Sequence, residues 1–300
     1  MIKNRLVLLG ATLWTGLLHA GGPGTSSGNV LKMSPSPRAS AMGEAYTAVA
    51  DGADALFWNP AGLIRIQKRS VLLTHGYSGE STAVNYGAYG QKAGDSNAWA
   101  VGIHSLTHGT LTGADGSGND TSSFTPNDLA LSLGGAHTFK SFRLGASVKY
   151  VRSTIVKTAT TATADIGLLS RGYLKGKLRL ALTATNLFGS LTYDQAEEQL
   201  PRAIRAGGAY RIRPRWLASA ELAIPNDGPA SGGVGTEVEM AKTKDMGLTG
   251  RAGYTTRANI PGAGISAGLG VRFKKMNIDY AFVPLGDVGQ SHQMSIAYRF

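Results

Sequence analysis

Residues 265–273 read ISAGLGVRF, and this stretch indicates the fold class. Its large apolar side chains alternate with Ser, Gly and Arg. Successive side chains of a β-strand point to opposite faces, so one face of this strand is apolar and the other is small or polar. The same period of two recurs in LRLALTA at 178–184 and in LGASVKY at 144–150. The chain is therefore predicted to be all-β.

The charged residues inside these stretches fall on the small, polar face. Arg272 shares its face with Ser266 and Gly270, and Asp165 shares its face with Thr163. A charge on the lipid face of a membrane strand costs about 2–4 kcal/mol near the bilayer midplane, so this sorting favours a transmembrane barrel whose charges point into the lumen. The expected luminal charges are Lys149, Asp165, Arg179, Arg205, Glu221, Glu237, Glu239, Arg251, Arg272 and Asp279.

Counting such stretches predicts fourteen antiparallel strands between residues 70 and 300. An even number of strands, mostly of about 9–11 residues, is typical of outer-membrane barrels. The expected strands are 70–77, 82–91, 96–107, 127–138, 142–152, 162–170, 177–186, 202–211, 214–224, 234–241, 246–255, 264–273, 275–283 and 291–300.

The connections between these strands mostly alternate between short and long, although the short connection 78–81 departs from the rule. The longer ones, such as 108–126 and 187–201, are expected outside the cell, because outer-membrane barrels have short periplasmic turns and longer outer loops. Lys and Arg gather on the short connections, while most loop acids lie on the long ones. The formal charge of +11 is thus expected to form a periplasmic rim and not a nucleic-acid groove. This rim consists either of solvated turns and snorkelling anchors or of groups that attract lipid head groups or an acidic partner.

The N-terminus has the composition of a cleaved export signal, assigned to residues 1–20. Lys3 and Arg5 precede an apolar run from Leu6 to Leu18 that is too short to span a bilayer as a helix. No later apolar run reaches the roughly 18 residues that a transmembrane helix needs. The mature protein is therefore expected in the outer membrane, in contact with its lipids.

The last strand resembles the terminal strand that outer-membrane barrels present to their assembly machinery. HQMSIAYRF ends on an aromatic residue, although Ser295 stands where this pattern usually has Gly. The resemblance implies that the barrel assembly machinery is a partner. The residues of this assembly signal are Met294, Ile296, Tyr298 and Phe300.

Residues 38–63, RASAMGEAYTAVADGADALFWNPAGL, differ from everything after them. The stretch is rich in Ala, with few large aliphatic residues, and it lies in the segment 21–69 before the first strand. A lumen within fourteen strands is too wide for wall side chains to fill. We therefore expect a short helical plug there, which needs few large apolar residues because the wall is polar.

The motif Asn59, Pro60, Ala61 and Gly62 is expected to end the helical part of this plug. Pro60 drives Asn59 to an extended conformation, and Gly62 supplies conformational freedom for a turn. The plug also carries acidic side chains that are expected to pair with luminal Arg179, Arg205 or Arg251. These plug acids are Glu44, Asp51 and Asp54.

The stretch 38–63 resembles the N-terminal hatch of FadL-like outer-membrane proteins, whose Asn-Pro-Ala motif sits in the plug. The C-terminal DYAFVPLGDVGQSHQMSIAYRF, residues 279–300, resembles more narrowly the PorV/PorQ branch of that superfamily. The PorV/PorQ resemblance implies a role in type IX protein secretion, with secreted cargo proteins as partners. The alternative is a FadL-type channel that takes up hydrophobic small molecules, such as long-chain fatty acids, through a side opening in the barrel.

Catalytic and metal-binding motifs do not emerge from the sequence. There is no Cys, the six His residues assemble no HExxH motif, and no GxSxG elbow occurs. A wall-embedded hydrolase with a Ser, His and Asp or Asn triad has no local sequence signature and stays open as a third reading. We expect no enzyme activity, no cofactor, no metal and no nucleic-acid partner.

Overall fold

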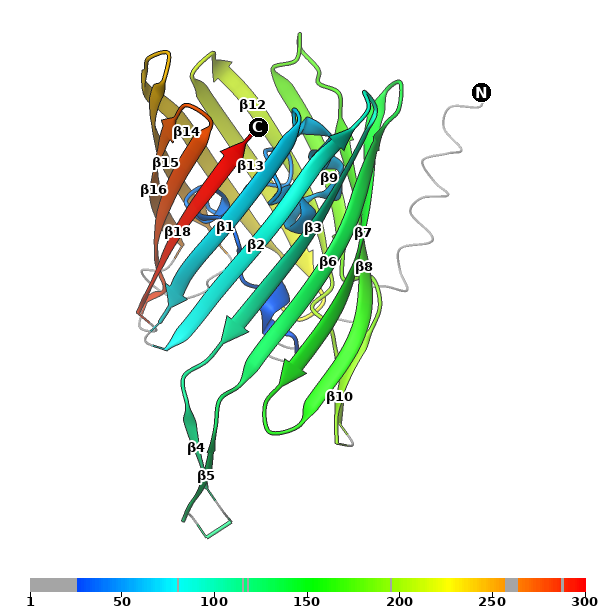
Figure 1. Cartoon of the computed structure of the whole chain (residues 1–300), viewed down its shortest axis with the longest axis vertical. Coiled ribbons are helices and arrows are strands. Elements are labelled where there is room, and N and C mark those ends of the chain that lie inside the picture. Colours follow the sequence, from blue (N-terminus) through cyan, green and yellow to red (C-terminus); the bar gives the residue numbers. More distant parts are fainter. Residues whose placement is uncertain are drawn as a thin grey trace.

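The structure is a computed structural model that describes residues 26–79, 81–114, 116–117, 119–194, 196–256, 264–286 and 289–300. Fourteen antiparallel strands close into one barrel, in which the first strand pairs with the last (Figure 1). The all-β barrel fold predicted from the sequence is confirmed. The barrel strands are β1 (Arg69–Ser78), β2 (Thr82–Ala93), β3 (Asn97–Thr107), β6 (Asn127–Thr138), β7 (Phe142–Thr154), β8 (Thr158–Ser170), β9 (Leu178–Thr185), β12 (Ala203–Arg213), β13 (Trp216–Pro225), β14 (Ser231–Lys242), β15 (Met246–Thr255), β16 (Ile265–Phe273), β17 (Met276–Pro284) and β18 (Gln290–Arg299).

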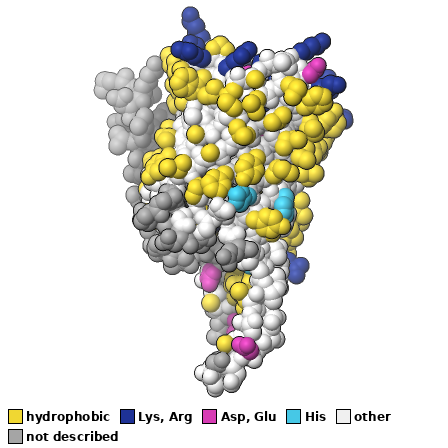
Figure 2. Space-filling view, turned by 90° about the vertical axis from the view of Figure 1, so that its left-hand side faces the viewer, with side chains coloured by type: hydrophobic (Ala, Val, Ile, Leu, Met, Phe, Trp, Pro, Cys, Tyr) yellow, Lys and Arg dark blue, Asp and Glu magenta, His cyan; other side chains and the backbone are white. Residues whose placement is uncertain are grey.

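Each strand has an outward face that is apolar and an inward face that is small or polar. In β16, Leu269 and Val271 are exposed on the outside, whereas Ser266 is buried on the inside. Figure 2 shows many outward apolar side chains on the face of the wall that it draws. A continuous apolar band is what a wall in contact with lipid tails requires, because an exposed charge there is costly.

The two ends of the barrel differ in their connections. One end, which we call the short-turn end, carries tight turns and both the start of β1 and the end of β18. The opposite, long-loop end carries two additional hairpins, β4 (Leu111–Ala114) with β5 (Asp120–Phe124) and β10 (Ser190–Tyr193) with β11 (Ala196–Gln199). The β4–β5 hairpin projects well beyond the barrel (Figure 1).

The expected loop pattern needs two corrections. The connection expected at 153–161 is only 155–157, because β7 and β8 extend toward each other beyond the predicted ends. The stretches 108–126 and 187–201 are not plain loops but contain the two hairpins. Lys and Arg do gather at the short-turn rim, and acidic side chains lie on the projecting hairpin (Figure 2). Which end faces the cell exterior stays a prediction.

Residues 26–66, the N-terminal segment, lie inside the barrel (Figure 1). The segment is not one helix but four short pieces, with Gly43 and Gly52 between the second and third pieces and Pro60 at the start of the fourth. These pieces are η1 (Asn29–Leu31), α2 (Pro37–Ser40), α3 (Ala55–Trp58) and η2 (Pro60–Arg65). None of the helices in the described ranges is long and apolar enough to cross a bilayer. The predicted export signal at 1–20 lies outside the described residues.

Candidate functional site

The turn at Asn59 fixes the N-terminal segment to the barrel wall. Asn59 is fully buried and extended, with φ −160° and ψ 102°, as expected of a residue before proline. Its Oδ1 accepts a hydrogen bond from the Ala61 N–H at 3.0 Å, and its Nδ2 donates to the carbonyl oxygen of Thr47 at 3.0 Å. Nδ2 also lies 3.3 Å from the carbonyl oxygen of Leu168 in β8. One side chain thus joins two parts of the segment and the wall.

Glycines of the wall make room for this turn. A Cβ at Gly145 of β7 would lie 2.2 Å from the Ala61 nitrogen, and one at Gly167 of β8 would lie 2.1 Å from Asn59 Oδ1. Gly235 and Gly253 lie equally close to the backbone around Met42. The inward phase of such glycines was visible in the sequence, but their contacts with particular residues of the segment were not predicted.

Gly62 has a different role from the one expected. It does not adopt the left-handed conformation, so the turn does not need its freedom. A Cβ at this position would lie 2.7 Å from the carbonyl oxygen of Ala50. The N-terminal segment packs so closely against itself here that only a residue without a side chain fits at position 62. The α-helix α3 does end at the motif, with Asn59 as its extended C-cap, but a 3-10 helix, η2, follows from Pro60.

Replacing Gly145 with Ala is expected to loosen the Asn59–Ala61 turn. The added methyl group overlaps main-chain atoms, which cannot rotate away, and overpacking of this kind costs about 1–3 kcal/mol. Gly208→Ala is the matched control, because its Cβ would meet nothing closer than 3.7 Å. Limited proteolysis of the folded barrel should cut Gly145→Ala within residues 57–66 faster than the control. Equal cleavage rates would contradict a tight fit at this turn.

The interface between segment and wall is more apolar than expected. Trp58, Leu56, Met42 and Tyr46 are fully or almost fully buried, and they pack with inward Ala and Leu side chains of the wall such as Leu169. The prediction of a polar interface with few large side chains was wrong. The reason is that several inward positions carry Ala where a wholly hydrated lumen would carry polar residues.

A charge network, centred on Asp51 and Arg38, connects the segment to strands β14, β15, β17 and β18 of the wall. Arg38 binds Glu237 of β14 through two hydrogen bonds of 2.7 and 2.9 Å, and it binds Asp51 at 2.9 Å. Glu237 continues to Arg251 at 2.8 Å. The network ends where Arg251 binds Asp279 of β17 at 2.7 Å.

Asp51 does not pair with the luminal arginines that the sequence suggested. It binds Arg38 and Arg65 of its own segment, and Arg299 of β18 at 3.2 Å. Burial opposes ionisation of Asp51, but the three guanidinium groups outweigh burial and hold its pKa well below the ordinary value. Arg38, Arg65 and Arg299 were missed because their relation to Asp51 depends on the three-dimensional path of the segment.

The other two acids of the segment also differ from expectation. Asp54 accepts hydrogen bonds from the hydroxyls of Ser36 and Tyr46, each at 2.9 Å. Burial raises the pKa of Asp54, and the nearby Asp51 carboxylate raises it further. Glu44 has a positive φ of 60° and closes the turn after α2 by donating its N–H to the Ala39 carbonyl oxygen at 3.1 Å.

The remaining predicted luminal charges all lie on inward phases of their strands. Lys149 and Asp165 form a buried ion pair of 2.6 Å, while Arg272 lies 3.7 Å from Glu239. Glu221 accepts the N–H groups of Tyr46 and Thr47 at 3.0 and 2.8 Å. All three arginines expected to meet acids of the segment meet other groups, since Arg251 binds Glu237 and Asp279 of the wall. Arg205 pairs with Glu221 at 3.4 Å, and Arg179 donates to the Ala48 carbonyl oxygen at 3.3 Å.

The N-terminal segment reaches the long-loop end through an apolar cluster, the mouth cluster. Its members are Val30, Leu31, Val84, Leu106, Ala130, Val151, Ala159, Leu191 and Leu200. Lys32 binds Asp227 at 2.6 Å beside this cluster, and Val30 donates its N–H to Asp128 at 3.2 Å. The lumen is thus lined by apolar side chains at the end that carries the long loops.

The wall has a weak seam between β8 and β9. The paired residues there are only Ile166–Leu169 with Ala181–Ala184, which makes this the shortest of the fourteen ladders around the barrel. β9 ends at Thr185, and Asn186 has a positive φ of 54° that turns the chain away. Past the ladder, the Leu187 N–H still donates to the Ala164 carbonyl oxygen at 2.9 Å.

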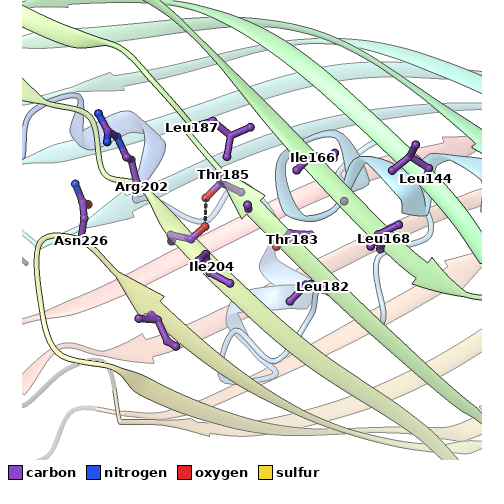
Figure 3. Close-up of a pocket in the computed structure, with 14 residues that line it drawn as sticks. Leu144, Ile166, Leu168, Leu182, Thr183, Thr185, Leu187, Arg202, Ile204 and Asn226 are labelled. Atoms are coloured by element: carbon purple, nitrogen blue, oxygen red, sulfur yellow. Dashed lines mark hydrogen bonds between the residues drawn. The ribbon is translucent and has the colours of Figure 1, made fainter. Parts of the chain in front are cut away.

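An apolar groove of about 280 Å³ lies at this seam, and we call it the wall groove (Figure 3). Leu182 and Ala184 of β9 lie between large side chains of the neighbouring strands, Ile166 on one side and Ile204 on the other. Because the Ala184 side chain is small, the space between Ile166 and Ile204 is not filled, and this space is the depression. Arg202 and Asn226 form its polar end, on the chain segments next to β12 and β13 (Figure 3).

No family model matches the chain, and no curated protein matches it. Solved structures do. The toluene transporter TbuX of Ralstonia pickettii aligns with 94% of this chain and 99% of its own, at a TM-score of 0.62 and 14% identity. The toluene transporter TodX of Pseudomonas putida aligns with 94% and 97%, at 0.61 and 14%.

A FadL homologue of Pseudomonas aeruginosa aligns with 88% of this chain and 98% of its own, at a TM-score of 0.60 and 13% identity. The fold is that of the FadL-like outer-membrane channels. At these identities the likeness concerns the fold alone. The solved FadL-like structures are described as transporters and channels, and the PorV/PorQ resemblance stays a prediction.

The C-terminal residues of the barrel lie on the outward face. Met294, Ile296, Tyr298 and Phe300 are each exposed on the wall, and the rings of Tyr298 and Phe300 contact each other. Their role as an assembly signal stays a prediction. Within the described ranges, no three His, Asp or Glu residues come together as a metal site.

Proposed function

We propose that this protein is an outer-membrane channel that lets hydrophobic small molecules pass between the medium and the membrane. The observation that carries the proposal is the combination of a filled lumen with a weak seam beside an apolar groove. A molecule that enters at the mouth cluster finds the straight path occupied by the N-terminal segment. The short β8–β9 ladder then offers the way with the fewest hydrogen bonds to break.

The proposed path suits an apolar molecule at each step. The mouth cluster offers side chains such as Leu106 and Leu191, and the wall groove offers Leu182 and Ile204. A hydrophobic molecule gains about 25 cal/mol for each Å² of apolar surface that leaves water along this path. The FadL-like fold supports the proposal, since TbuX and TodX share it and are described as toluene transporters.

Cross-linking the seam tests this function. The chain has no native Cys, so Ile166→Cys with Ala184→Cys places one disulfide across the β8–β9 ladder. We expect toluene uptake by cells carrying this variant to fall about ten-fold on oxidation and to recover on reduction, because a ten-fold effect requires only about 1.4 kcal/mol on the opening step. The measurement is uptake of labelled toluene.

The control pair is Val148→Cys with Ala164→Cys, which crosses the long β7–β8 ladder. Uptake through this variant should be the same before and after oxidation. If the seam variant also transports equally well in both states, the β8–β9 seam is not the exit.

The secretion role is the second candidate. The β4–β5 hairpin pairs with itself and projects farthest from the barrel (Figure 1), so it offers edges to a protein partner. Removal of residues 111–124 should abolish recovery of secreted proteins with the purified barrel if cargo binds there, while toluene uptake stays unchanged. Absence of any co-purified secreted protein from native membranes would count against this candidate.

A further inference from the structure

The polar end of the wall groove holds two groups whose hydrogen-bonding capacity is unused. Asn226 is 8% exposed, and its Oδ1 is buried with no hydrogen-bond partner, while its Nδ2 donates to Leu200 at 3.2 Å. The Nε of Arg202 is also buried without a partner. Arg202 forms no ion pair with any residue in the described part of the chain. Buried polar groups are normally satisfied by protein, water or a ligand, and here an open acceptor and an open donor belong to residues that line the same groove.

The two residues are neighbours held by the backbone. Asn226 donates its N–H to the carbonyl oxygen of Arg202 at 3.0 Å, which continues the β12–β13 ladder by one step. Arg202 directly precedes β12 and Asn226 directly follows β13. Both therefore lie where membrane-spanning strands end, which is the level of lipid head groups.

The apolar part of the groove leads from this level into the membrane-facing wall. Ile204 and Ile224 follow Arg202 and Asn226 on the outward face, and Leu182 and Leu168 lie deeper along the same depression (Figure 3). The arrangement is a cation at the surface with an apolar channel below it. It matches the chemistry of a lipid, which carries its charge at the surface and its chains below.

We propose that the wall groove binds an anionic phospholipid from the leaflet at the long-loop end. The phosphate accepts hydrogen bonds from the Arg202 guanidinium, whose planar set of donors fits phosphate oxygens in pairs. One acyl chain lies along Ile204 and Leu182. The volume of about 280 Å³ suits a single chain, so the second chain stays in the surrounding bilayer. Basic pockets between membrane-spanning elements recognise lipid head groups in this way.

A purely apolar molecule fits the apolar part of the groove, but it fits the polar end less well than a phospholipid does. At that end it would cover the Arg202 side chain without offering an acceptor, and leaving a buried donor unpaired is unfavourable. The site also requires only the outer wall of the barrel. It therefore goes beyond the proposed transport function, and the two can fail separately.

Native mass spectrometry of the full chain in nonionic detergent tests the site. The probes are phosphatidylglycerol, phosphatidylcholine and oleate, each added at the same concentration. We expect phosphatidylglycerol adducts to be the most abundant and to fall about ten-fold in Arg202→Gln. Arg152→Gln is the matched control, because Arg152 is exposed on the outside near the long-loop end of β7 and does not line the groove.

A second pair of variants tests the groove without touching charge. Ala184→Leu fills the depression and should also weaken phosphatidylglycerol binding about ten-fold, whereas Ala220→Leu, on the outward face of β13, should not. Equal losses in Arg202→Gln and Arg152→Gln would show non-specific charge attraction and overturn the site. Arg202-dependent binding of oleate without phosphatidylglycerol binding would overturn the assignment to a phospholipid.

Discussion

Deletion of residues 38–63 should turn a nearly closed barrel into a large, steady pore. These residues include α2, α3 and the Asn59 turn, and they occupy the lumen at the level of the main apolar cluster. A wall of fourteen strands encloses a lumen that its own side chains leave open. Single-channel recording in planar bilayers should show native protein with almost no conductance and the deletion variant with a high, stable one.

The control deletion removes the β4–β5 hairpin instead, between residues 111 and 124. This hairpin pairs with itself and projects away from the lumen (Figure 1), so its loss should leave the bilayer current at the native level. Heat-modifiable gel mobility would verify that both deletion variants contain a folded barrel. If folded protein without residues 38–63 conducts no more than native protein, these residues do not close the channel.

Asp51→Asn should release the N-terminal segment from the wall at neutral pH. The change removes the carboxylate that Arg38, Arg65 and Arg299 share. Removing one partner from a buried ion pair costs about 3–5 kcal/mol, because the remaining charge stays buried and uncompensated. Arg299 is half exposed and contributes less than the other two. Urea unfolding of the barrel and protease sensitivity of the segment should both report the loss.

The effect of Asp51→Asn should depend on pH with a definite sign. The folded-state pKa of Asp51 is lowered, so its stabilisation is complete above the unfolded value of about 3.9 and is lost as the pH falls through the folded-state value. Asp54 has a raised pKa, so its ionised form is the one that folding disfavours. Asp54→Asn keeps an acceptor for Ser36 and Tyr46 and should change stability by less than about 1 kcal/mol.

These two substitutions are three residues apart in one segment, which makes them a matched pair. Equal destabilisation by Asp51→Asn and Asp54→Asn at pH 7 would contradict the central role of the Asp51 network. Equal effects of Asp51→Asn at pH 7 and at pH 3 would contradict the lowered pKa.

The strands could be predicted because the two faces of a membrane barrel meet different surroundings. Leu269 must face lipid and Ser266 must face the lumen, so the period of two survives in the sequence. The connection at 155–157 was misjudged because Thr-rich ends of β7 and β8 carry little apolar contrast. The sequence therefore predicts which face of a strand each side chain lies on more clearly than it predicts where the strand ends.

The partners within the lumen could not be predicted in the same way. Asp51 meets Arg299, 248 positions away, only because the segment crosses the lumen and β18 closes the barrel beside it. No local pattern encodes such a meeting. Gly145 and Gly167 were a better signal, because an inward glycine in a strand marks a close approach of another backbone.

The path of the N-terminal segment also has a consequence for the order of assembly. Ser26 lies at the long-loop end, paired with Gln199, while the segment enters β1 at the opposite end. Its backbone lies close to glycines of β7, β14 and β15 on the way, and its side chains lie close to glycines of β8 and β16. A chain could not be drawn through a finished cylinder while matching so many close fits. We therefore expect the segment to be in place before β1 and β18 pair and close the barrel.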